Sequence, residues 1–69
     1  MNIYIQTGPM VAGNLMATGF IKQVSNREDA SRVKYGDAQS LCKQAQAKWP
    51  AAQWEIERVG DRYIVETEG

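Results

Sequence analysis

The sequence contains no histidine, which removes the usual proton acceptor at neutral pH and the commonest protein ligand of zinc. It has one cysteine, so no internal disulfide can form, and this usage fits a reducing cytoplasm better than a secreted scaffold. Eight acidic and eight basic residues cancel, so no overall charge attracts or imitates a nucleic-acid backbone. These absences exclude hydrolytic triads and typical zinc sites, and they disfavour a dedicated nucleic-acid binder.

Charge is also absent from residues 1–21, because all eight acids and all eight bases follow that stretch. A secretory signal needs a basic start, and the only positive charge before Lys22 is the terminal amine. Polar residues, glycines and Pro9 interrupt the stretch too often for a membrane span. The sequence therefore predicts a cytoplasmic protein without membrane association.

At 69 residues the chain has room for one hydrophobic core, so we expect a single domain over residues 1–69. Alternating apolar residues predict a strand over residues 2–6. Glycine and proline then predict a loop over residues 7–14, and residues 15–24 are typical of a second strand. Alternation of Arg32 and Lys34 with Val33 and Tyr35 predicts a third strand over residues 30–35.

The strongest periodic signal is an apolar stripe at helical spacing, i, i+3, i+4, i+7 and i+11. Its members are Ala38, Leu41, Cys42, Ala45 and Trp49. Asp37 is a suitable N-cap, and Pro50 cannot continue a helix. The pattern predicts a helix over residues 38–48.

Residues 53–69 predict a β-hairpin in which Gly60 and Asp61 form a two-residue turn. This register pairs Arg58 with Tyr63, Ile56 with Val65 and Trp54 with Thr67 on one side. The other side pairs Val59 with Arg62, Glu57 with Ile64 and Glu55 with Glu66, and it is mostly charged.

The predicted fold is α+β, with an antiparallel sheet of four to five strands and one α-helix packed across one face. Fourteen residues are expected to point inward: Ile3, Ile5, Phe20, Val33, Tyr35, Ala38, Leu41, Cys42, Ala45, Trp49, Trp54, Ile56, Tyr63 and Val65. So small a core leaves homodimerisation through a sheet edge or the methionine-containing loop open.

No catalytic, metal-binding or cofactor-binding residue is expected, so the sequence predicts a non-enzymatic protein. Cys42 lies within the apolar stripe with no histidine to activate it. The stretch GPMVAG has the glycine spacing of a phosphate-binding loop, but Asn14 and Leu15 stand where lysine and serine or threonine are required.

Two sets of residues are candidates for contact with another protein. Met10, Val11 and Met16 either fold back onto the core or form an adaptable apolar patch. Glu55, Glu57, Glu66 and Glu68 form the acidic set. Glu55 and Glu66 face each other in the hairpin and repel unless a cation lies nearby, which an arginine or lysine of a partner could supply. The alternative is a solvated sheet face near Arg62.

A third set favours nucleic acid instead. Arg27, Arg32 and Lys34 could contact phosphates of RNA or DNA, with Tyr4 or Tyr35 stacking on bases. The balanced charge of the chain makes this the second hypothesis.

The helical stretch AQSLCKQAQAKW followed by WEIERVGDRYIVE sets the order of the later elements. In length, charge balance and element order the chain resembles small phage-encoded inhibitor proteins, including anti-CRISPR proteins. The resemblance is one of architecture and carries no functional residue over to this chain. It implies a protein that acts in the host-cell cytoplasm by blocking a surface of a larger protein or nucleoprotein complex.

Overall fold

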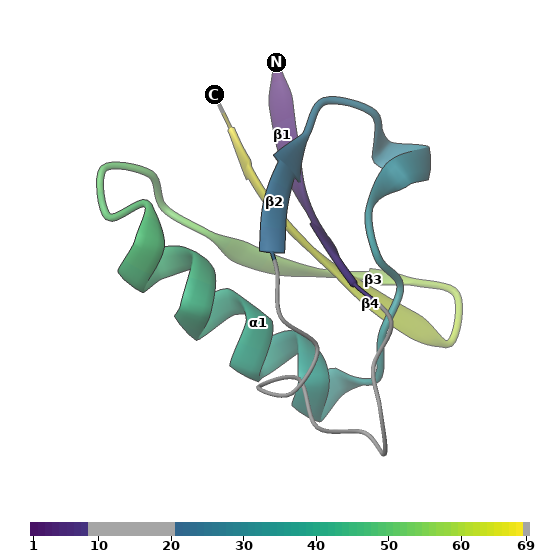
Figure 1. Ribbon diagram of the computed structural model, residues 1–69. Helices are drawn as coiled ribbons and strands as arrows, with labels where there is room; N and C mark the ends of the chain where they lie inside the picture. The colour runs from purple at the N-terminus through teal and green to yellow at the C-terminus, as the bar shows by residue number, and fades with distance from the viewer. Residues whose placement is uncertain (9–20, 69) are drawn as a thin grey trace.

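The computed structural model describes residues 1–8 and 21–68 (Figure 1). Within these residues lie one α-helix and one four-stranded antiparallel sheet, with strand order β2-β1-β4-β3. The elements are β1 (Asn2–Thr7), β2 (Ile21–Val24), the 3-10 turn η2 (Arg27–Asp29), α1 (Tyr35–Lys48), β3 (Glu55–Val59) and β4 (Arg62–Glu68). The predicted α+β class is confirmed, with four strands.

The hairpin of β3 and β4 has the predicted register along its whole length, from Val59 opposite Arg62 to Glu55 opposite Glu66. Gly60 begins the turn with φ of 64°, in the left-handed region that glycine enters without steric penalty. Trp54 lies just before β3, so its expected pairing with Thr67 does not form as a strand pair. The Thr67 hydroxyl instead donates to the Gln53 carbonyl oxygen at 2.6 Å.

Helix α1 ends at Lys48 as predicted, with Trp49 as its C-cap before Pro50. It begins at Tyr35, three residues earlier than predicted, and its N-cap is Lys34 rather than Asp37. Asp37 lies in the first turn, where its negative charge interacts favourably with the free backbone N–H groups. Asp37 therefore indicated the region in which the helix begins, but not its first residue.

The larger of two buried clusters joins the helix to the sheet. Its members are Ile5, Val33, Ala38, Leu41, Ala45, Trp54 and Val65, all predicted to point inward. Ile3, Cys42, Trp49, Ile56 and Tyr63 pack around it and are partly buried. The prediction for Tyr35 is wrong, because its side chain is 52% exposed and meets the Tyr63 ring edge-on at 5.0 Å. Phe20 lies outside the described residues.

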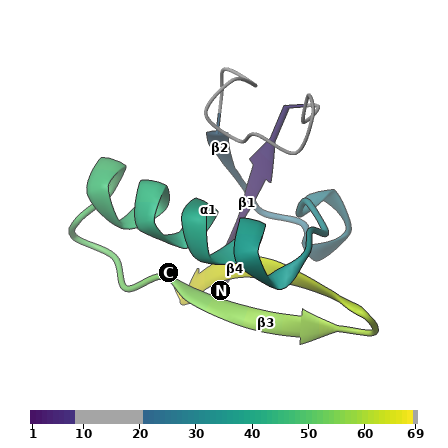
Figure 2. The ribbon, with the colours of Figure 1, turned by 90° about the horizontal axis from the view of Figure 1, so that it is seen from below.

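Strand β1 pairs with β4 only from Asn2 to Tyr4. Beyond Tyr4 the two strands diverge, and the segment that follows η2 lies in the fork between them. Ser31 N–H donates to the Ile5 carbonyl oxygen, and Ser31 Oγ accepts the Thr7 N–H at 2.9 Å. On the other side of the fork, Val33 and Tyr63 exchange two backbone hydrogen bonds of 2.9 and 2.8 Å. Figure 2 shows the result, with β1 and β2 standing at a steep angle to β3.

The third strand predicted over residues 30–35 is therefore wrong. Only Val33 makes a β-bridge, and Tyr35 already belongs to the helix. The segment touches β1 at one residue and β4 at another, because those strands have diverged, so no continuous ladder can form. We call residues 30–33 the wedge.

A second, smaller cluster lies on the opposite face of the sheet. Tyr4, Ala30 and Ile64 are buried there, and Val24 and Val59 pack against them. The prediction that this side is mostly charged is thus wrong for one end of it. The reason is that η2 and the wedge fold over that end, where the Gln6 side chain donates to the Asp29 carbonyl oxygen at 3.0 Å.

Truncation of Ile64, which is 1% exposed, tests the second cluster. We expect Ile64→Ala to lower the free energy of unfolding by roughly 2–5 kcal/mol, because it leaves a cavity between η2 and the sheet. Arg62→Ala is the matched control, since Arg62 is exposed on the same face of the same strand, and it should change that free energy by less than about 0.5 kcal/mol. Urea denaturation measures both; equal effects would contradict a buried second cluster.

Candidate functional site

Four glutamates of the hairpin lie on one face of the sheet. Glu55 and Glu57 alternate along β3, Glu66 and Glu68 alternate along β4, and Glu55 stands directly opposite Glu66. Side chains two residues apart in a strand share a face, so the register places all four together. Glu55 and Glu68 are exposed, and Glu57 and Glu66 are partly buried. We call these four residues the acidic face.

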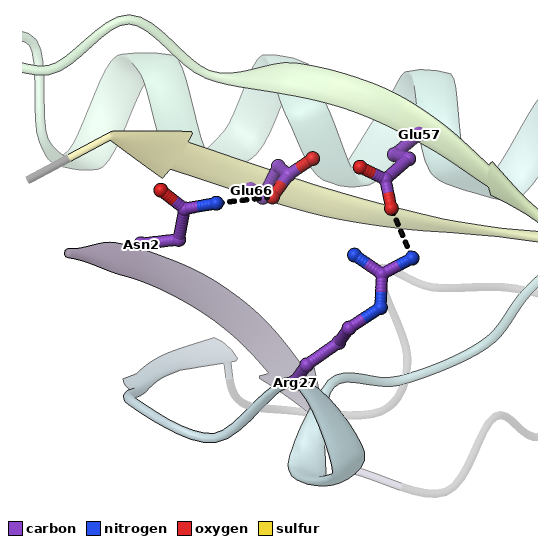
Figure 3. A network of polar contacts seen from close by, with 4 residues as sticks. All are labelled: Asn2, Arg27, Glu57 and Glu66. Atoms are coloured by element: carbon purple, nitrogen blue, oxygen red, sulfur yellow. Dashed lines mark hydrogen bonds and ion pairs between the residues drawn. The ribbon is translucent and has the colours of Figure 1, made fainter.

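Within the described residues, the acidic face receives a cation from η2. Arg27, in η2, forms an ion pair through Nη2 with Oε1 of Glu57 (Figure 3). The hydrogen bond to Glu57 also raises the pKa of the Arg27 guanidinium. The sequence predicted a cation beside the facing pair Glu55 and Glu66, whereas Arg27, carried by η2, pairs with the neighbouring Glu57.

Glu66 has a neutral partner instead. Asn2, at the start of β1, donates from Nδ2 to Glu66 Oε2 at 3.2 Å (Figure 3). The carboxyl groups of Glu57 and Glu66 also interact with each other. Two like charges side by side disfavour full ionisation of the pair.

The interaction shifts the pKa values of the two glutamates in opposite directions. Hydrogen bonding with Arg27 and then with Glu66 lowers the pKa of Glu57, whereas hydrogen bonding with Glu57, followed by burial, raises the pKa of Glu66. Glu57, which pairs with Arg27, is therefore the more acidic of the two, and Glu66 is the one whose ionised form is disfavoured. Glu55 and Glu68 add further negative charge without an ion pair in the described part of the chain.

The exposed pair Glu55 and Glu68 lines a hollow at the end of the hairpin. Its volume is about 530 Å³, and its other lining residues are Ala51, Ala52, Gln53 and Thr67. An ammonium or guanidinium group that entered this hollow would meet two carboxylates and the carbonyl-rich loop before β3.

The other candidate residues are placed differently. Arg27 forms an ion pair with Glu57. Arg32 and Lys34 are exposed and lie on either side of the buried Val33. The three basic residues proposed for nucleic acid therefore do not act as one free set. Met10, Val11 and Met16 lie outside the described residues.

Cys42 packs against the hydrophobic core and is partly buried. Its thiol donates to the Trp54 carbonyl oxygen at 3.4 Å, and burial, followed by the charge of Glu55, raises its pKa. A raised pKa keeps the thiol protonated and so disfavours the reactive thiolate. Within residues 1–8 and 21–68, no group of three or more cysteine, aspartate or glutamate side chains is arranged to hold a metal ion, and no helix is long and apolar enough to cross a membrane.

Sequence reasoning found all four glutamates but missed Asn2, Tyr4 and the partnership of Arg27 with Glu57. The alternation of Asn2 and Tyr4 with Ile3 puts both on the face opposite the helix, which is a readable signal. The sequence does not show that β1 lies beside β4 in the sheet. Without that information neither side chain can be placed near Glu66.

Comparison of the chain with known protein families, characterised proteins and solved structures finds no match. What the chain binds must be inferred from its own residues.

Replacement of Glu66 by glutamine tests the raised pKa of Glu66. Because the pKa of Glu66 is raised on folding, the folded chain loses stability as the pH rises from the ordinary value of 4.5 through the raised one. Glu66→Gln keeps the shape and the hydrogen bonds but has no proton to lose. We expect its free energy of unfolding to match that of the unmodified chain at acidic pH and to exceed it at neutral pH, in urea titrations across that range.

Glu57→Gln should behave in the opposite way. The pKa of Glu57 is lowered on folding, so its ionised form stabilises the chain above 4.5, and this contribution is lost as the pH falls. Glu57→Gln should therefore be less stable than the unmodified chain at neutral pH, with the difference shrinking on acidification. Parallel pH profiles for the two variants would contradict opposite shifts of the two pKa values.

Proposed function

We propose that this chain is a non-enzymatic binding protein whose acidic face docks against arginine and lysine side chains on a larger protein or nucleoprotein complex. The observation that carries the proposal is the grouping of Glu55, Glu57, Glu66 and Glu68 on one face of the hairpin. Arg27 pairs with Glu57 there, and the raised pKa of Glu66 shows that its ionised form is disfavoured. A partner cation next to Glu66 would favour its ionised form, so binding would offset the repulsion between the carboxylates of Glu57 and Glu66.

Accessibility supports the same face. Glu55 and Glu68 are exposed and flank a hollow of about 530 Å³, and the hairpin that presents them is continuously paired from Glu55 opposite Glu66 to Val59 opposite Arg62. The apolar part of the contact is proposed to come from Met10, Val11 and Met16.

The proposed action is steric and electrostatic block of the partner's surface, as in the small phage-encoded inhibitors that the chain resembles in architecture. A bound domain of 7.7 kDa covers enough surface to exclude a substrate or a nucleic-acid strand from a basic groove. The proposed place of action is the cytoplasm of the host cell.

Double charge reversal tests the acidic face. We expect Glu55→Lys combined with Glu68→Lys to abolish recovery of the partner when tagged chain is incubated with a nuclease-treated bacterial lysate. Neither side chain has an ion-pair partner within the described residues, so the fold should persist, as circular dichroism would check. Glu28→Lys combined with Asp61→Lys makes the same change in net charge at exposed positions elsewhere and should retain binding.

Equal recovery by both double variants would refute the acidic-face proposal. Recovery that requires intact nucleic acid would instead favour the RNA- or DNA-binding hypothesis, with Arg32 and Lys34 as the available contacts. In that case affinity should fall steeply with salt concentration, because neutralised phosphates release counterions.

A further inference from the structure

The sheet ends in a strand whose outer edge is open. β3 is the last strand in the order β2-β1-β4-β3, and it has one neighbour, β4. In the described part of the chain no backbone hydrogen bond reaches its outer side. An open edge of this kind is a template for another extended segment.

The register identifies the backbone groups on that edge. The N–H and the carbonyl oxygen of Tyr63 both form hydrogen bonds with Val33. Neither group therefore points at Arg58, the residue opposite Tyr63 in the hairpin. Arg58 and Tyr63 are thus a non-hydrogen-bonded pair, and the N–H and C=O of Arg58 point away from β4. Ile56 is two residues away and has the same orientation. Ile56 and Arg58 therefore offer two donors and two acceptors to an added strand.

Side chains beside this edge differ between the two faces. On the acidic face the edge carries Glu55 and Glu57. On the face shared with the helix it carries Ile56, which lines a pocket of about 350 Å³. The other residues that line this pocket are Gly36, Gln39, Ser40, Cys42 and Lys43. One edge thus presents free backbone groups, carboxylates on one face and a partly apolar pocket on the other.

We propose that the β3 edge binds an extended segment of a partner by strand addition, with basic and apolar residues alternating along that segment. Successive side chains of an added strand point to opposite faces. Its basic residues would lie beside Glu55 and Glu57, and its apolar residues would enter the pocket at Ile56. This inference rests on the proposed function and specifies the chemistry of the partner.

A second copy of the chain fits this edge poorly. Self-pairing about a two-fold axis is antiparallel and must match the outward groups of Ile56 and Arg58 with each other. The three registers that do so place Glu57 opposite Glu57, Glu55 opposite Glu57, or Arg58 opposite Arg58. Like charges directly opposite are destabilising, so the edge favours a basic segment over a homodimer.

The first probe is a blocked peptide of alternating arginine and valine, about seven residues long. We expect it to shift the amide resonances of Ile56 and Arg58 in NMR spectra of the labelled chain and to slow their hydrogen exchange. The control for charge is a peptide of the same composition in which all arginines precede all valines, so that it keeps the charge but loses the alternation. A peptide methylated on the valine nitrogens keeps every side chain but loses the donors that face β3, and it should bind about tenfold more weakly.

The matched pair of protein variants is Arg58→Pro and Arg58→Ala. Both remove the side chain, but only proline removes the outward N–H, and proline at an edge position leaves the bonds to β4 intact. We expect Arg58→Pro to bind the alternating peptide about tenfold more weakly than Arg58→Ala. If Arg58→Pro does not fold, the methylated peptide gives the same comparison on the unmodified chain.

The outcomes separate this inference from the proposed function. Binding that is lost with Glu55→Lys and Glu68→Lys but unaffected by methylation would overturn strand addition and leave the acidic face in place. Absence of binding by the alternating peptide would also overturn strand addition, while capture of a partner from lysate would still test the acidic face. Concentration-dependent protection of Ile56 and Arg58 without peptide would mean that a second copy occupies the edge, against the inference.

Discussion

The wedge between β1 and β4 is the constraint on which the rest of the structure depends. Its backbone bonds through Ser31 and Val33 hold two strands that have already diverged. Val33 enters the cluster shared with the helix, whereas Ala30 enters the cluster on the opposite face. One short segment therefore closes both sides of a sheet that is too small to bury two faces with its strands alone.

The same segment sets the electrostatics of the acidic face. Because the wedge pulls η2 over the second cluster, Arg27 reaches Glu57 from an element that is remote in sequence. The interaction with Glu57, followed by burial, then raises the pKa of Glu66, and the hydrogen bond from Asn2 offsets part of this rise. The contact with Arg27 lowers the pKa of Glu57. Packing and charge are thus coupled, since the apolar contacts of Tyr4, Ala30 and Ile64 position the cation.

Both proposed contacts belong to the hairpin, and its geometry relates them. The acidic face and the open edge are presented by β3, with Glu55 and Glu57 belonging to each. Alternating charge on an edge strand also discourages self-pairing, which would otherwise be a hazard for so small a sheet. An edge that repels its own copy while it retains free backbone groups can remain available to a partner of opposite charge.

Local patterns in the sequence determined the hairpin register, the Gly60 turn, the end of α1 and the grouping of the four glutamates, because each depends on residues close together in the chain. Only the tertiary structure decided the strand order, the burial of Tyr4 and Ile64, and the partnership of Arg27 with Glu57. Those features join segments far apart in sequence, and their energies depend on which surfaces meet. Alternation shows that Ile64 and Glu57 share a face, but it cannot show that a turn 30 residues upstream covers one of them and neutralises the other.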